Sequence, residues 1–211
     1  MQNKNYLSTI IIVVVIIGVL AFFKMQGGSQ KAIANIPEPI QTEARGQTKM
    51  TIDDIEATIN YLYSYDIDAL VVHTKNYSGS GVEAKFAPKD LALAWGDVAA
   101  HNKDIDFHWS QSNRWYFWRV KSYDELAPVG NEEDVSRQSS NNHVIAADDA
   151  VRSTVKKIRT GDHVHLKGYL INLEATDSKG GIYTWNSSTS RTDSGDHSCE
   201  LIYVTEASIV N

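Results

Sequence analysis

The sequence is poor in cysteine, and this shortage excludes a disulfide framework. Cys199 is the only cysteine of the chain, so no internal disulfide can form. A folded domain of the size available here can bury a hydrophobic core without disulfides, so a single thiol is compatible with an exported protein. A lone exposed thiol would be oxidised outside the cytoplasm, and we therefore expect Cys199 to be buried.

Positive charge is also scarce. The chain has 20 Lys and Arg against 26 Asp and Glu, for a formal net charge of −6. The only charged residues among the first 24 are Lys4 and Lys24, so the remainder is more acidic still. Because affinity for nucleic acid comes mainly from clustered basic residues, we expect no nucleic-acid partner.

Long apolar runs are limited to one, which extends from Leu7 to Phe23 without a charge or a proline. Bilayer hydrocarbon is about 30 Å thick, so roughly 17–25 apolar residues can span it as a helix. Only a helix or a closed barrel satisfies its backbone in lipid. The run predicts a transmembrane helix at 7–23 that follows a cytoplasmic tail at 1–6.

A cleaved signal peptide is the alternative, since Ala32-Ile-Ala34 has the form of a cleavage site. Signal peptides have apolar regions of about 7–15 residues, and this run is longer and ends well before that site. We therefore expect an uncleaved anchor in the inner (plasma) membrane. Lys4 nearly balances Lys24 and Lys31, so the positive-inside rule says little about orientation. The short tail favours a periplasmic domain.

The rest of the chain is predicted to be a polar linker at 24–50 and a soluble α+β domain at 51–211, with halves at 51–130 and 140–211 left open. We expect antiparallel sheet with about three helices. Thr51 begins the first helix, whose apolar residues are Ile52, Ile55, Ile59 and Leu62. Pro88 begins the second and Asp148 the third. Residues 130–142 are expected to form a surface loop or the junction between the two halves.

Period-two patterns and turn residues predict the strands. The expected strands span residues 67–77, 162–173, 182–185 and 199–204, with a hairpin formed by 105–109 and 114–120. Within the hairpin, the run Arg114–Arg119 contains four aromatic residues, and we expect a central strand buried on both faces. An alternative is a stacking platform for a sugar or a peptide. Gly161–Ile171 resembles the bent first strand of a small OB-like barrel, which would form the C-terminal part.

Two pairs of residues could bind a metal: His163 with His165, and His197 with Cys199. Ligands at i and i+2 of a strand point to one side, so two such pairs on adjacent strands could complete a tetrahedral site. The spacing lacks the specific zinc patterns. The simpler interpretation is that Val164 and Leu166 face the core while the histidines face water. We therefore expect no bound metal and no cofactor.

Hydrolysis is a second possible chemistry, with Cys199 or a serine as nucleophile and His143 or His197 as base. Arg191 and Asp193 would complete this candidate catalytic set. The sequence contains no Gly-x-Ser-x-Gly nucleophile elbow. The preferred interpretation of the segment from Trp185 to Glu200 is a polar loop that is organised by side-chain bonds to its own backbone.

Several segments together resemble a group of uncharacterised bacterial membrane-anchored envelope proteins. The resemblance is closest in the C-terminal third of the chain and rests on the motifs at Ala87–Gly96, Ser140–His143, Gly161–Leu170, Trp185–Gly195 and Cys199-Glu200. It implies a bacterial origin and brings no activity with it.

The first functional expectation is a non-enzymatic binding or assembly module of the bacterial cell envelope. Its expected partners are the membrane, through one transmembrane helix, and other envelope proteins. An anchored hydrolase that acts on an envelope polymer and a metal-binding module are the alternatives.

Overall fold

The computed structural model describes residues 31–190 and 199–210. The predicted anchor at 7–23 lies outside these residues, as do Arg191, Asp193 and His197. Within the described ranges, no helix is both long and apolar enough to cross a membrane.

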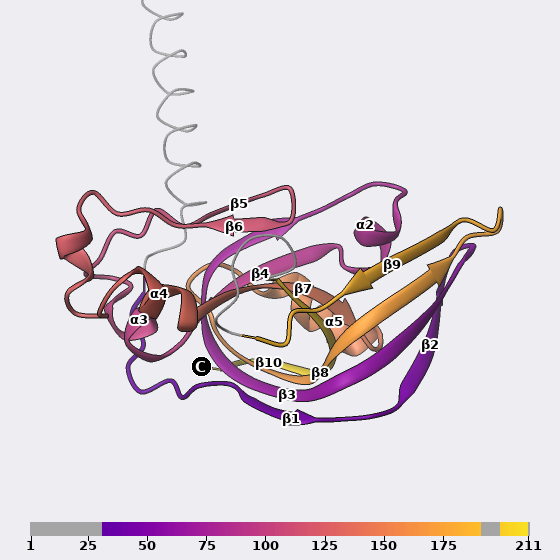
Figure 1. Cartoon of the computed structure of the whole chain (residues 1–211), viewed down its shortest axis with the longest axis horizontal. Coiled ribbons are helices and arrows are strands. Elements are labelled where there is room, and N and C mark those ends of the chain that lie inside the picture. The colour runs from indigo at the N-terminus through magenta and orange to yellow at the C-terminus, as the bar shows by residue number, and fades with distance from the viewer. Residues whose placement is uncertain (1–30, 191–198, 211) are drawn as a thin grey trace, which may run out of the picture.

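Five strands pair in a closed ring, so the sheet curls into a small barrel (Figure 1). Each strand is hydrogen-bonded to the next, and the ring closes where the last strand pairs with the first. In ring order the strands are β3 (Ile55–Asn76), β4 (Lys89–Ala94), β7 (Ser139–Ala146), β10 (Glu200–Val210) and β8 (His163–Thr176).

The remaining strands extend the sheet or lie beside it. β1 (Ile40–Glu43) and β2 (Gln47–Ile52) pair with β3, and β9 (Ile182–Asn186) pairs with β8. A separate hairpin consists of β5 (Ser110–Ser112) and β6 (Trp115–Phe117).

Four short α-helices and one 3-10 helix lie in the described chain. They are α2 (Val82–Phe86), α3 (Gly96–His101), α4 (Glu132–Arg137), α5 (Asp149–Lys157) and η1 (Tyr123–Leu126). The α+β class is confirmed, with four α-helices where about three were expected. The sheet is mixed instead of wholly antiparallel, because β7 and β10 run parallel.

The predicted helix at 52–62 is wrong, because these residues belong to β2 and β3. The isoleucines at 52, 55 and 59 match helical spacing by coincidence. The buried set in the strand is Ile55, Ala57 and Ile59, which alternates with period two. Pairing with β2 and β8 overrides the local pattern, as β-branched residues favour.

Two further predictions fail for the same kind of reason. The segment after Pro88 is strand β4, in which Leu91 and Leu93 face the barrel interior, so the predicted helix is wrong. The predicted loop at 130–142 contains α4, with a capping box between Asn131 and Asp134, and the start of β7. The polar residues of β7 led to the loop prediction, but the strand is buried along its full length.

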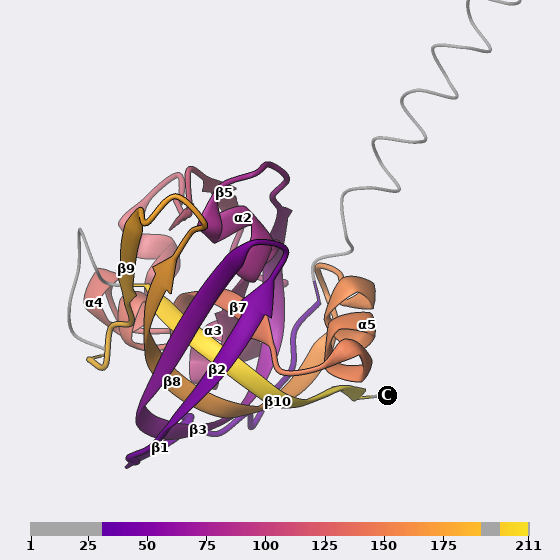
Figure 2. The same cartoon turned by 90° about the vertical axis from the view of Figure 1, so that its right-hand side faces the viewer.

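Part of the predicted linker is ordered. β1 and most of β2 fall within residues 24–50 and pair with β3. The third helix is confirmed as α5, and Asp148 accepts a hydrogen bond from the Val151 amide as its N-cap. Val151 and Val155 of this helix pack into the main hydrophobic cluster beside β10 (Figure 2).

The segment predicted to be the first strand of a small barrel lies in β8, where it neighbours β3 and β10. Gly168 has a packing role there. A Cβ atom at this position would lie 1.9 Å from the Tyr203 carbonyl oxygen, so only glycine allows β10 to approach. The first strand of the barrel is β3 instead. Its pairing register with β8 shifts between Tyr61 and Tyr63.

Strand register separates an inner and an outer face of the barrel. Val71, Leu93, Val144 and Ile202 share the inner face, and each is at most 4% exposed. The outer face of β4 and β7 carries polar residues. These are also buried, because the β5–β6 hairpin, α2 and β9 cover that face.

Candidate functional site

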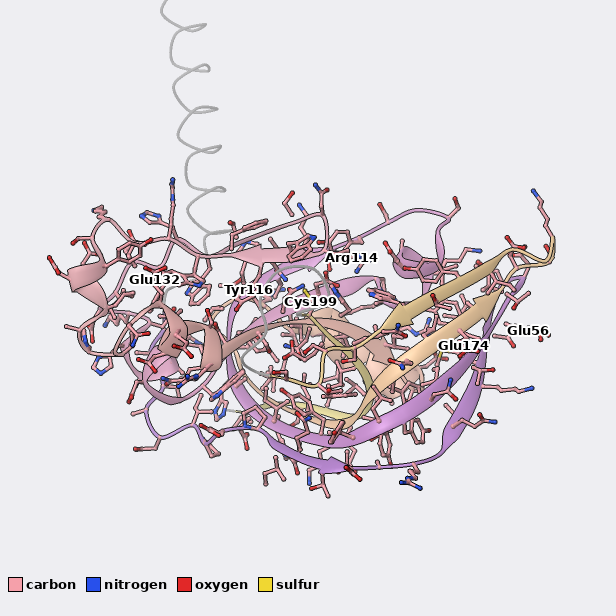
Figure 3. All side chains as sticks on the ribbon, viewed as in Figure 1. Glu56, Arg114, Tyr116, Glu132, Glu174 and Cys199 are labelled. Atoms are coloured by element: carbon pink, nitrogen blue, oxygen red, sulfur yellow. The ribbon has the colours of Figure 1, made fainter. Side chains whose placement is uncertain are left out.

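An ionic cluster lies on the covered outer face of the barrel. Asp90 on β4 and His143 on β7 are register partners, so their side chains lie next to each other. Arg114 reaches them from the turn between β5 and β6, at the position labelled in Figure 3. Asp90 is fully buried and His143 is 3% exposed. Buried charged groups of this kind require partners.

Asp90 is hydrogen-bonded to Arg114 and lies close to His143, without a hydrogen bond between its carboxylate and the imidazole of His143. Its Oδ1 accepts a hydrogen bond of 2.7 Å from Nη1 of Arg114, and its Oδ2 lies 3.0 Å from Nδ1 of His143. Nη1 of Arg114 also donates to the Ala87 carbonyl at 2.8 Å. The hydrogen bond to Arg114 thus fixes the hairpin against the barrel, and the other carboxylate oxygen faces the imidazole ring.

Aromatic rings enclose the same cluster. The Arg114 guanidinium carbon lies 3.7 Å from the centre of the Tyr77 ring and 5.5 Å from that of Trp185. The His143 and Trp185 ring centres are 4.8 Å apart. Burial raises the pKa of Tyr77, so this ring stays neutral beside the arginine.

An amide network continues from the cluster along β7. Asn141 is fully buried; it accepts a 2.5 Å hydrogen bond from Nε2 of Gln111 and donates a 2.7 Å bond to the Arg114 carbonyl. Nδ1 of His73 in β3 lies at hydrogen-bond distance, 2.9 Å, from Oε1 of the same Gln111 amide. The Cys199 sulfur lies 3.6 Å from both Asn141 Nδ2 and the Arg114 carbonyl oxygen.

An open pocket of about 670 Å³ lies beside Arg114. Tyr183 of β9 forms one wall and donates a 2.5 Å hydrogen bond to Glu83 of α2. Burial and this bond raise the pKa of Tyr183. Both hydrogen bonds that the Arg114 side chain makes to described residues use Nη1. The other lining residues are Tyr77, Ser78, Gly79, Gly81, Val82, Ala84 and Asn113.

The structure brings two of the predicted hydrolase residues into one cluster. His143 contacts Asp90, and Cys199 contacts the backbone of Arg114, which binds the same aspartate. Cys199 is half-buried, so the expectation of a buried thiol is not met in full. Arg191 and Asp193 lie outside the described residues.

The described residues of the predicted metal site do not converge on one point. His165 Nε2 lies 2.6 Å from Asp66, and His163 Nε2 lies 3.5 Å from Asp68. His163 pairs with Val210 at one end of β10, whereas Cys199 precedes the other end of that strand. His197 is not among the described residues. Within the part of the chain that the structure describes, no group of three or more His, Cys, Asp or Glu residues could hold a metal ion.

The aromatic run Arg114–Arg119 is not a central strand, so that prediction is wrong. It forms one side of the two-stranded hairpin, in which Tyr116 and Trp118 pack on the main core. Phe117 is 50% exposed. The hairpin inserts between β4 and β7 in the chain, and its arginine supplies a charge to the outer face of both strands.

Sequence reasoning missed Asp90, Tyr77 and Tyr183. The sequence did contain a signal for Asp90: two charged residues, Lys89 and Asp90, interrupt an otherwise apolar segment, and that segment forms a buried strand.

Comparisons with known proteins found no match to a family model, to a curated protein or to a solved structure.

Proposed function

We propose that the chain is a single-pass membrane-anchored protein whose domain is an OB-like binding module of the bacterial cell envelope. The observation that carries this proposal is the pocket beside Arg114. Ligand pockets typically measure 300–1,000 Å³ and combine aromatic rings with a few polar groups, and this pocket meets both criteria.

The strand order supports the OB-like interpretation. The OB-fold is a five-stranded Greek-key barrel that binds ligands on strands two and three and on the loops after strands one and four. Here those strands correspond to β4 and β7. The corresponding loops are residues 77–88, between β3 and β4, and the region between β8 and β10 that includes β9.

The pocket lies where this comparison predicts a ligand. Ser78 and Glu83 come from the first loop region, and Tyr183 comes from the second. Asn113 and Arg114 are added by the β5–β6 hairpin. Three segments that are distant in sequence therefore converge on one concave surface, supported by the barrel beneath them.

Membrane attachment rests on the apolar run at 7–23 and can be tested separately. We expect the full chain to remain in the membrane fraction at high salt and the domain to be accessible to protease from the periplasmic side. Release by salt, or protection of the domain in intact spheroplasts, would contradict this part of the proposal.

The binding site is tested by photo-crosslinking in native membranes. A benzoylphenylalanine placed at Ser78, which is exposed in the pocket, is expected to give a discrete adduct. The matched control is Glu132, an exposed residue of α4 that does not line the pocket and lies to the left of Arg114 in Figure 3. Equal labelling at the two positions, or none at Ser78, would refute a binding site in the pocket.

An anchored hydrolase is the second candidate function, favoured by the pairing of His143 with Asp90. A carboxylate that is hydrogen-bonded to an imidazole orients a general base, and here the two groups lie 3.0 Å apart without that hydrogen bond in place. Under this alternative, Cys199→Ser abolishes turnover of a polymer bound in the pocket while binding persists. A bound ligand that is recovered unchanged after long incubation would favour the binding module.

A further inference from the structure

We propose that the pocket beside Arg114 binds a neutral oligosaccharide. This inference rests on the proposed function, because it names the ligand class of the same pocket. It is carried by the charge balance of the lining, by its aromatic walls and by its mixture of hydrogen-bond donors and acceptors.

Charge balance argues against a polyanion. Arg114 is the only basic residue that lines the described pocket, and Asp90 already binds its Nη1 at 2.7 Å. Glu83 adds a carboxylate to the lining. A chain with a net charge of −6 also repels polyanions over longer distances. The pocket therefore offers little net attraction to a phosphate or sulfate polymer.

Aromatic rings provide flat surfaces for sugar faces. Tyr77 and Tyr183 line the pocket. Trp185 packs edge-on against Tyr183 with ring centres 6.5 Å apart, and the Arg114 guanidinium covers one face of Tyr77. Each ring joins an apolar body to a polar tip, which suits a ligand with apolar C–H faces and polar edges. Tyr77 is held in place by the guanidinium of Arg114 and by the hydrogen bond from the Arg114 amide to its hydroxyl.

The polar groups match hydroxyls and acetamido groups. A sugar hydroxyl both donates and accepts, so it needs both kinds of partner nearby. Glu83 accepts, Arg114 donates, and the Asn113 amide can do either. Gly79 and Gly81 leave the backbone of the same wall open to close approach by a ligand.

The pocket is open to solvent, so a ligand longer than the pocket can extend beyond it. A volume of about 670 Å³ accommodates a few sugar rings. The ligand would then be a segment of a polymer of the envelope, which fits a domain attached to the membrane.

The test is a titration of the full chain in a detergent without a sugar headgroup, followed by tryptophan fluorescence. The neutral probes are chitotetraose, cellotetraose and maltotetraose. A heparin tetrasaccharide, a thymidine tetranucleotide and a tetrapeptide serve as comparisons. We expect saturable binding of at least one neutral probe and none of the comparisons.

Matched variants locate the binding. Ser78→Trp fills the pocket from an exposed position, whereas Ser78→Ala leaves it open. We expect the first to weaken binding by about tenfold or more and the second to leave it within about twofold. Tyr183→Phe keeps the ring and retains most of the affinity, whereas Tyr183→Leu removes the ring and loses about tenfold.

The outcomes separate this inference from the proposed function. Failure of every neutral probe, with a crosslink at Ser78 still observed in membranes, overturns the sugar ligand and keeps the binding module. Equal binding by Ser78→Trp and Ser78→Ala, or preference for an anion or a peptide, also overturns it. Absence of both the crosslink and the sugar binding refutes both proposals.

Discussion

Asp90→Asn should be among the most destabilising isosteric substitutions in this chain. The carboxylate is fully buried and lies within 3.0 Å of nitrogens on both Arg114 and His143. Asparagine keeps the shape but removes the negative charge, which leaves the arginine facing a neutral amide. Breaking a buried ion pair from one side typically costs 3–5 kcal/mol. Since the Arg114 side chain is 14% exposed and can recover some hydration, we expect about 3 kcal/mol here.

The assay is urea unfolding of the full chain in detergent, followed by the fluorescence of its five tryptophans, all of which lie in the described domain. The midpoint should fall while the slope stays unchanged. Asp68→Asn is the matched control, because its carboxylate is 37% exposed and lies 3.5 Å from His163. That variant should lose less than about 1 kcal/mol. If Asp90→Asn were no more destabilised than Asp68→Asn, the ionic cluster would not hold the hairpin on the barrel.

Three other predictions concern stability. Gly168→Ala should cost about 3 kcal/mol or more in the same unfolding assay, because the added Cβ would meet the Tyr203 carbonyl oxygen at 1.9 Å; wild-type stability would contradict the close approach. Asp148→Ala removes the N-cap of α5 and should cost about 1 kcal/mol, with no loss counting against the cap. Burial raises the pKa of Tyr116 to about 12 from 10.0, so its contribution to stability is complete below pH 10 and is lost as the pH rises towards 12. Tyr116→Phe should therefore lose less stability than wild type across that interval, and an identical decline in both would be the contrary result.

Elements with a complete local signal were predictable from the sequence. α5 has an N-cap at Asp148 and apolar residues on one face. β8 alternates Val164 and Leu166 with outward-facing histidines. In both cases the residues that specify the element lie within a few positions of one another.

Elements specified by distant partners were not predictable in this way. β3 carries a helical spacing of isoleucines, which its pairing with β2 and β8 overrides. β7 looks like a loop because its Ser and Asn residues are polar. Several of those side chains find partners within the barrel or in the hairpin: Asn142 donates to Ser140, and Asn141 accepts from Gln111.

The candidate site illustrates the same limit. His143 and Cys199 could be singled out by residue type, but their convergence depends on the parallel pairing of β7 and β10. The ion pair of Asp90 with Arg114 joins positions 24 residues apart through a hairpin that folds back over the barrel. The pocket needs three such segments at once, and no local pattern in the sequence encodes their meeting.

The measurement that bears most directly on the central claim is the ratio of dissociation constants between Ser78→Trp and Ser78→Ala for the ligand captured at Ser78 in membranes. Binding in the pocket beside Arg114 predicts a ratio of about ten or more, because the indole occupies the space that the ligand needs. A ratio near one, with both variants folded as judged by urea unfolding, would contradict the assignment of this pocket as the binding site.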